Sequence, residues 1–126
     1  ATARDWIRIG ILILNEGKMG QKQIIPKSWL NDMATSSQAN PNYGYLTWLG
    51  NEHQKNRVYN PKSTATGHHS EPYDDRDIIY LDGFGGQRVY IIPSKELVIV
   101  RTGSTQMEWD DSVLPNILSR GIKKDK

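Results

Sequence analysis

The first third of the chain carries apolar residues at helical spacing. This pattern predicts a helix that begins after Thr2 and ends near Gly17. The segment Thr2-Ala3-Arg4-Asp5 fits a capping box, in which the Thr2 hydroxyl and the Asp5 carboxylate bond free backbone N–H groups. A short extended piece is expected over 23–25, and a second helix over 26–33 with the proline in its first turn. The apolar positions of the first helix are Trp6, Ile7, Ile9, Leu12 and Ile13.

Beyond the second helix the pattern changes to strands. The aromatic, alternating segment 43–50 predicts one strand, and further strands are expected over 77–81, 87–93 and 96–102, with a turn at 93–95. The run LVIV at 97–100 is apolar throughout, which predicts a strand buried on both faces. A last helix, capped by Asp110 or Asp111, is expected to run to about Arg120. Its apolar face would hold Val113, Leu114, Ile117 and Leu118.

The segment 51–76 is polar and shows no apolar periodicity. A loop of more than about 12–15 residues inside a compact domain is usually either functional or disordered, and both readings stay open. The order of elements is helix, helix, strand, long loop, three strands and helix. This order predicts an α+β fold, in which an antiparallel sheet is packed with helices.

Composition narrows the class of protein. A chain of 126 residues has the size of one domain, and no apolar run reaches the roughly 18–20 residues that span a membrane. The absence of cysteine excludes disulfides, thiolate metal sites and cysteine nucleophiles. The net charge is +2, and much of the excess lies in the terminal GIKKDK, which reads as a solvated tail. No basic patch alternates with aromatic residues, so we expect no nucleic-acid partner.

One short loop gathers histidines and carboxylates that could hold zinc or manganese. No second cluster of this kind occurs, so a solvated polar loop is favoured and no metal or other cofactor is predicted. A Ser-His-Asp triad has no support either, because no serine lies in a G-x-S-x-G elbow. The residues of this loop are His68, His69, Glu71, Asp74, Asp75 and Asp77.

Three glycines, Gly83, Gly85 and Gly86, lie between two expected strands. A glycine inside a strand often marks the close approach of a ligand or of another backbone, although an ordinary glycine-rich turn has the same pattern. The segment GFGGQ is not a phosphate loop, because neither Lys-Ser/Thr nor a helix follows it.

Three segments, TARDWIRIGILILNEGKMGQKQIIPKSWL, YGYLTWL and GFGGQRVYIIPSKELVIVRTG, occur in this order. Together they resemble the C-terminal part of the serine β-lactamase and penicillin-binding-protein-like hydrolases. The resemblance is to the class C-like branch, which includes esterases, D-amino-acid peptidases and 6-aminohexanoate-dimer hydrolases. It implies that 1–35 is the end of a helical region and that 43–126 is the sheet part with its C-terminal helix. It also suggests a periplasmic or extracellular location, which the sequence itself leaves open.

In that family a Lys/His-Thr/Ser-Gly motif lies on an edge strand beside the nucleophile. The matching residues here are Leu81-Asp82-Gly83, so the lysine and the hydroxyl are both replaced. The resemblance implies that the backbone N–H of Phe84 is an oxyanion-hole donor. It also implies that substrate is bound by Leu81, Asp82, Gly83, Gly85, Gly86 and Gln87. The rival segment 101–103, Arg-Thr-Gly, is rejected because it follows the LVIV strand and is expected at the wrong end of the sheet.

The family's nucleophile motif S-x-x-K and its Y-x-N motif do not occur in this sequence. We therefore expect a C-terminal fragment of a serine hydrolase for an ester, amide or peptide bond, inactive by itself. Its partners would be a small-molecule or peptide-like substrate and the missing N-terminal half. The alternative is a catalytically inactive module that binds a peptide or peptidoglycan. Faces that the missing half would cover also predict self-association of the fragment.

Overall fold

The computed structural model describes residues 1–51, 56–59, 62, 64 and 66–122, and it has an α+β fold. The sheet has the order β3-β6-β7-β8, and every neighbouring pair is antiparallel. Its strands are β3 (Trp48–Leu49), β6 (Ile79–Gly83), β7 (Gln87–Ile92) and β8 (Leu97–Arg101). The helices are α1 (Ala3–Leu14), α2 (Lys27–Met33) and α3 (Val113–Gly121). Two small hairpins pair β1 (Lys18–Met19) with β2 (Lys22–Gln23), and β4 (Asn56–Val58) with β5 (Thr66–His68).

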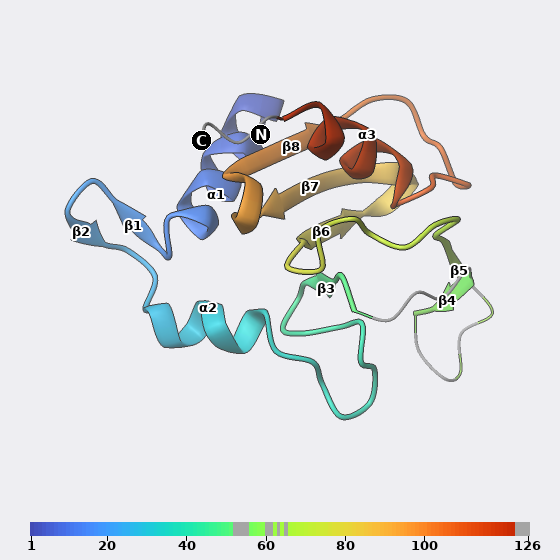
Figure 1. The fold of residues 1–126 in the computed structure, drawn as a ribbon, viewed down its shortest axis with the longest axis horizontal. Helices are drawn as coiled ribbons and strands as arrows, with labels where there is room; N and C mark the ends of the chain where they lie inside the picture. Colours follow the sequence, from blue (N-terminus) through green and yellow to red (C-terminus); the bar gives the residue numbers. More distant parts are fainter. Residues whose placement is uncertain (52–55, 60–61, 63, 65, 123–126) are drawn as a thin grey trace.

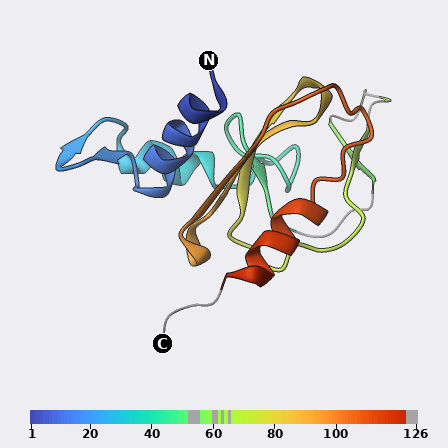
Figure 2. The same cartoon turned by 90° about the horizontal axis from the view of Figure 1, so that it is seen from above.

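The sheet has a helix on each side. Figure 1 shows the strands side by side, and Figure 2 shows α1 and α3 on opposite sides of them. Alternate residues of the strands therefore enter two separate cores. Tyr80, Tyr90 and Ile99 pack on the side of α3 with Leu114, whereas the other side packs against α1. The residues on the side of α1 are Leu49, Ile79, Leu81, Val89, Ile91, Val98 and Val100, with Ile13 and Leu14 of the helix.

The first helix begins and packs as its sequence predicts. Thr2 is its N-cap, and the Thr2 hydroxyl and the Asp5 carboxylate form the expected capping box. The helix lies close to the sheet at Gly10, where an added Cβ would come within 2.4 Å of a Val98 methyl group. The predicted second helix is also present, with Pro26 as its N-cap.

The hairpin of β6 and β7 is close to its predicted position. The observed β6 starts two residues later than expected, and the turn between β7 and β8 is a 3₁₀ turn, η2 (Pro93–Lys95). The LVIV run is less buried than predicted, because β8 is the last strand of the described sheet. Only Ile99 of this run is fully buried, while α1 and α3 cover the rest in part.

Two expectations for the middle of the chain are wrong. The strand expected over 43–50 is reduced to β3, because Gly44 and Thr47 close a turn before it through a backbone hydrogen bond of 2.9 Å. The polar segment 51–76 holds the β4–β5 hairpin, and the described part of it buries Arg57, His69 and Tyr73. Arg57 is buried by pairing with Asp82 and Asp111 outside the segment, and His69 packs against Tyr73, and an apolar pattern cannot reveal either contact.

The last helix is present, but its cap and its buried face differ from the prediction. Ser112 is the N-cap, and Asp110 accepts hydrogen bonds from the backbone and hydroxyl of Ser112 instead of capping the helix itself. Asn116 and Ser119 are buried because they bond residues 71–75, a contact that no periodicity records. Of the predicted apolar face, Leu114 packs on the core, whereas the exposed members are Val113, Ile117 and Leu118.

Two further sequence predictions concern membranes and the tail. None of the helices in the described ranges is long and apolar enough to cross a membrane. Of the terminal GIKKDK, which is predicted to be a solvated tail, Gly121 is the last residue of α3, and the lysine-rich part at 123–126 lies outside the described residues.

Candidate functional site

The site begins at the turn that joins β6 to β7, η1 (Phe84–Gly86). Gly85 and Gly86 have φ values of 72° and 83°, which glycine adopts readily and other residues do not. An added Cβ would lie 2.9 Å from a Thr105 methyl at Gly85, and 2.9 Å from the Trp109 Cβ at Gly86. These two glycines are therefore required by the backbone conformation and by the segment packed against the turn.

Polar contacts from β7, from β8 and from the segment after β8 fix this turn. The Gly85 carbonyl accepts hydrogen bonds from the Gln106 N–H at 2.9 Å and from Arg101 Nη1 at 3.2 Å. Arg88 Nη1 donates to the Gly83 and Gln87 carbonyls, each at 2.9 Å. The residue between these supports, Phe84, is 80% exposed. The turn thus presents Phe84 to solvent on a backbone that is held in place.

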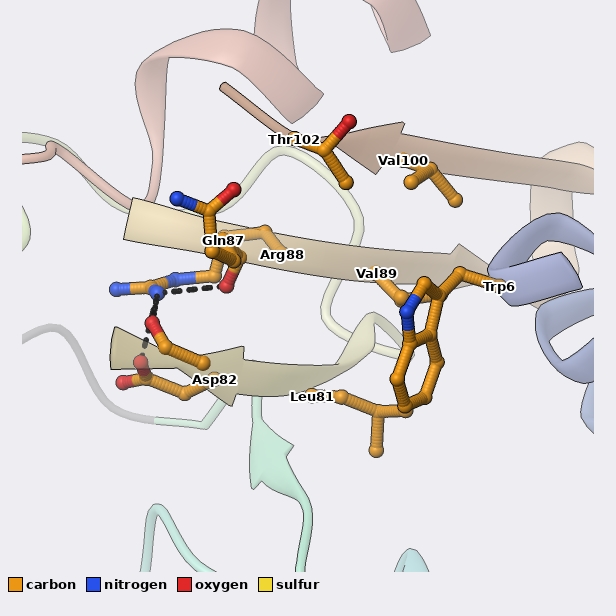
Figure 3. A pocket seen from close by; sticks show the side chains of 9 residues that line it. Trp6, Leu81, Asp82, Gln87, Arg88, Val89, Val100 and Thr102 are labelled. Carbon is orange, nitrogen blue, oxygen red and sulfur yellow. Dashed lines mark hydrogen bonds and ion pairs between the residues drawn. The ribbon is translucent and has the colours of Figure 1, made fainter. Parts of the chain in front are cut away.

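A pocket of about 350 Å³ opens on the α1 side of the sheet, beside this turn. Figure 3 shows Trp6, Leu81, Val89 and Val100 toward one end, while Asp82, Gln87 and Arg88 gather at the other. We call this space the sheet-end pocket. Its lining consists of Trp6, Leu81, Asp82, Gly83, Gln87, Arg88, Val89, Val100 and Thr102.

On the α3 side, two arginines and two aspartates form a closed ring of ion pairs. Arg57 contacts Asp82 at 3.2 Å and Asp111 at 2.8 Å. Arg88 contacts the same two carboxylates at 2.6 and 2.5 Å. This arginine–aspartate ring joins β4, β6, β7 and the segment before α3. Buried charges need such pairing, because an isolated charge in the interior is strongly disfavoured.

Aromatic side chains surround the ring. The Arg57 guanidinium lies 4.4 Å from the Trp48 ring centroid and 5.4 Å from that of Tyr80, both favourable cation–π distances. Burial lowers the pKa of Arg57, but Tyr80 and Asp111 outweigh it and raise the pKa above its usual value. Burial raises the pKa of the Asp82 carboxyl, against the lowering effect of Arg88. Arg57 therefore stays a cation, and Asp82 takes up a proton more readily than an exposed aspartate does.

The structure divides the predicted site residues into two groups. Leu81, Asp82, Gly83 and Gln87 line the sheet-end pocket, whereas Phe84, Gly85 and Gly86 lie on the adjoining turn, outside the lining. The Asp82 carboxylate is bonded within the arginine–aspartate ring and to the Tyr59 hydroxyl at 3.1 Å.

Sequence reasoning missed several members of this region. The cross-strand pair Asp82–Arg88 could have been found, because the register of the hairpin places these residues opposite each other. Arg57 and Asp111 had no such signal, since each comes from a distant segment. Trp6 was assigned only to the apolar stripe of α1.

The reason for rejecting the Arg-Thr-Gly segment at 101–103 is wrong. Arg88 pairs with Arg101 across β7 and β8, so this segment lies at the same end of the sheet as Gly83. Thr102 lines the sheet-end pocket, and the Gly103 N–H donates to Gln87 Oε1 at 2.9 Å. Arg101 bonds the Gly85 carbonyl and lies 4.7 Å from the Trp109 ring centroid, which makes it a support of the turn.

The prediction that the histidine-rich loop at 68–77 is solvated is wrong for His69 and Tyr73, which are buried. His69 is buried with its ring centroid 4.4 Å from that of Tyr73. Asp74 pairs with Arg120 at 2.6 Å, and Asp75 accepts a hydrogen bond from Ser119. Within the described residues, no group of three or more histidines and carboxylates is arranged to hold a metal ion.

Comparison with known proteins gives a structural likeness. No protein-family model matches the chain, and no curated protein matches it. The fold is similar to that of a Bacillus anthracis protein assigned as a 6-aminohexanoate-dimer hydrolase, with a TM-score of 0.57 and 24% identity. The match covers 97% of this chain and 28% of that chain, so this chain spans less than a third of its neighbour. The likeness is one of fold alone.

Proposed function

We propose that this chain is the substrate-binding and oxyanion-hole portion of a serine hydrolase that cleaves an ester, amide or peptide bond. The observation that carries the proposal is an exposed Phe84 on a fixed turn next to an apolar pocket. The structural neighbour, assigned as a 6-aminohexanoate-dimer hydrolase, supports a hydrolase. In this proposal 1–35 is the end of a helical region, and 43–126 is the sheet part.

The chemistry would divide between this chain and a segment that it does not contain. The serine of an S-x-x-K motif, which is absent from this sequence, attacks the carbonyl carbon and forms a new C–O bond. The ester C–O or amide C–N bond then breaks, the alcohol or amine leaves with the proton given up by the serine hydroxyl, and an acyl-enzyme remains for water to hydrolyse. The Phe84 N–H donates a hydrogen bond to the oxyanion that develops on the carbonyl oxygen. Such a donor is effective when it is already in place before the reaction, because no reorganisation is then needed. Arg88 and Arg101 keep the Phe84 N–H in place, because they donate hydrogen bonds to the carbonyls of Gly83 and Gly85 on either side of it.

A pair of substitutions at Phe84 tests the proposal in the longer protein that contains this chain. Phe84→Ala keeps the backbone donor and should retain most of kcat for a p-nitrophenyl ester or a linear amide. Phe84→Pro removes the donor and should lower kcat by about 10²–10³. Because proline can also disturb the strand, the thermal transition of each variant is measured first.

Two results would contradict the proposal. One is a folded Phe84→Pro enzyme with normal kcat. The other is stoichiometric acylation of a serine in this chain alone by a fluorophosphonate probe, detected by mass spectrometry. A longer protein that binds peptides without hydrolysing any substrate would instead support the inactive binding module.

A further inference from the structure

We propose that the sheet-end pocket binds a neutral, apolar acyl or alkyl group and discriminates against a carboxylate at the same place. This names the substrate class of the proposed hydrolase and in that sense rests on it. The binding preference itself belongs to this chain and can be measured without turnover.

The walls of the pocket are apolar. Trp6 reaches from α1 toward the sheet, and the side chains of Leu81, Val89 and Val100 lie around it (Figure 3). The space is about 350 Å³, within the usual range for a small-molecule site. Removing a ligand's apolar surface from water against these side chains provides the attraction, and a hydrocarbon group matches them.

The charges in the lining are already neutralised. Asp82 and Arg88 are the charged residues in the lining, and their charged groups lie on the α3 side of the sheet, within the arginine–aspartate ring. Arg88 contacts two carboxylates and two backbone carbonyls at 2.5 to 2.9 Å. To bind a ligand carboxylate, Arg88 would have to leave Asp82 or Asp111, and that buried anion would keep Arg57 as the only arginine of the ring that contacts it.

The other polar groups of the lining are neutral. The Gln87 amide donates to the Gly103 carbonyl and accepts from the Gly103 N–H, both at 2.9 Å. The Thr102 hydroxyl and the Trp6 indole N–H carry no charge. The lining thus has no unpaired cation to recognise a carboxylate, because its one arginine, Arg88, is already bound to two aspartates. An uncharged amide or ester meets no penalty of charge burial.

The test compares two ligands with the same carbon skeleton, hexanamide and hexanoate, in NMR titrations of this chain at pH 7. We expect hexanamide to give saturable shifts of the amide signals of Leu81, Gly83 and Gln87 and of the Trp6 indole N–H. Hexanoate should bind at least about tenfold more weakly, because its charge must be desolvated without a partner. Butanamide should bind more weakly than hexanamide by about fourfold for each methylene group removed.

Substitutions in the lining test whether hexanamide binds in the sheet-end pocket. Trp6→Ala removes the largest apolar wall and should weaken hexanamide binding about tenfold or more. Val100→Thr keeps the shape of the side chain and should weaken it about fourfold, comparable with the loss of one buried methylene. Trp29→Ala is the matched control, because Trp29 lies on α2 outside the pocket lining, and it should leave binding unchanged.

Three outcomes overturn the inference: equal affinity for hexanoate and hexanamide, unchanged hexanamide binding in both pocket variants, or no saturable shift with any amide. These outcomes are distinct from failure of the proposed function. A longer protein without hydrolytic activity would refute the hydrolase and leave the preference for a neutral ligand standing. A carboxylate-binding pocket would refute this inference alone.

Discussion

The two faces of the central sheet carry different kinds of side chain at the same end, charged ones on the α3 face and aliphatic ones on the α1 face. On the α3 face, the end of the sheet carries Asp82 and Arg88, which are enclosed with Arg57 and Asp111 in a closed ring. On the α1 face, the same end of the same strands carries aliphatic side chains, and a pocket of about 350 Å³ lies over them. The charged face is closed and the apolar face is open.

This difference separates residues that hold the fold from residues that can meet a ligand. From sequence, a charged residue at the end of a strand next to a glycine turn is readily interpreted as a substrate-binding residue, as Asp82 was. Here the Asp82 and Arg88 charges face one another, and their effect on a ligand is indirect: Arg88 also holds the Gly83 carbonyl at 2.9 Å. The ligand-facing surface is left to Trp6 and the aliphatic residues across the sheet.

The largest effect is expected from opening the arginine–aspartate ring. Asp111→Asn keeps the size of the side chain but leaves two buried arginines with one carboxylate. We expect the free energy of unfolding to fall by about 3–5 kcal/mol, measured by urea denaturation. The control is Asp74→Asn, whose partner Arg120 is 55% exposed and whose loss should amount to about 0–1 kcal/mol. If both variants lost the same amount, the contrast between a closed and an open face would have no energetic basis.

A somewhat smaller effect is expected at η1, the turn that joins β6 to β7. Gly86→Ala combines a φ of 83° with an added Cβ at 2.9 Å from the Trp109 Cβ. The conformational and packing penalties together should lower stability by about 2–4 kcal/mol. Gly20→Ala separates the two penalties, because Gly20 has a φ of 60° and no atom within 4 Å of the new Cβ.

For Gly20→Ala we expect only the conformational penalty of about 1–2 kcal/mol. Thermal unfolding of both variants gives the difference that is due to packing. Equal losses would mean that the segment around Trp109 moves away from the turn easily, and that Phe84 is not held as firmly as the contacts indicate.

The sequence predicted local features well and long-range polar contacts poorly. The capping box at Thr2 and the β6–β7 hairpin depend on neighbours within a few residues, so the local pattern contains them. Arg57 and Asp111 meet through contacts between distant segments, and neither apolar periodicity nor spacing records such a meeting. For the same reason the sequence predicted only part of the pocket lining. Its strand residues follow from the hairpin, but Trp6 joins them from a helix more than seventy positions earlier.

The stability of the fold should depend on pH through two aspartates whose pKa values are shifted in opposite directions, Asp110 and Asp82. Burial tends to raise the pKa of Asp110, but hydrogen bonds from Ser70 and Ser112 outweigh this effect and hold the pKa below its usual value. A folded pKa below the unfolded one means that Asp110 stabilises the fold above about pH 4, and that this stability is lost as pH falls through the folded pKa. Asp82 has the opposite sign, because its raised pKa favours proton uptake by the folded state.

Asp110→Asn should therefore flatten the acid side of the stability profile. Urea denaturation at pH 5, 4 and 3 should show the gap between the native sequence and this variant shrinking toward low pH, with a total change below about 1 kcal/mol for a carboxylate near the surface. A gap that stayed constant over this range would mean that the hydrogen bonds from Ser70 and Ser112 do not favour the ionised form.

The smallest effect is expected on the open face. Trp6 is 40% exposed, so replacing it removes only part of the apolar contact that a fully buried tryptophan makes. Alanine also has a higher helix propensity than tryptophan by about 0.5 kcal/mol. Trp6→Ala should therefore change the free energy of unfolding by less than about 1 kcal/mol, although truncation of a buried tryptophan usually costs 3–5 kcal/mol. Tyr90→Phe is the comparison on the closed face. It deprives the Trp109 indole N–H of its acceptor at 2.9 Å and should cost about 1–3 kcal/mol while removing a single atom. A loss of 3 kcal/mol or more for Trp6→Ala would show that Trp6 belongs to a core that is closed in solution. The open apolar face, and with it the pocket for a neutral ligand, would then have to be given up.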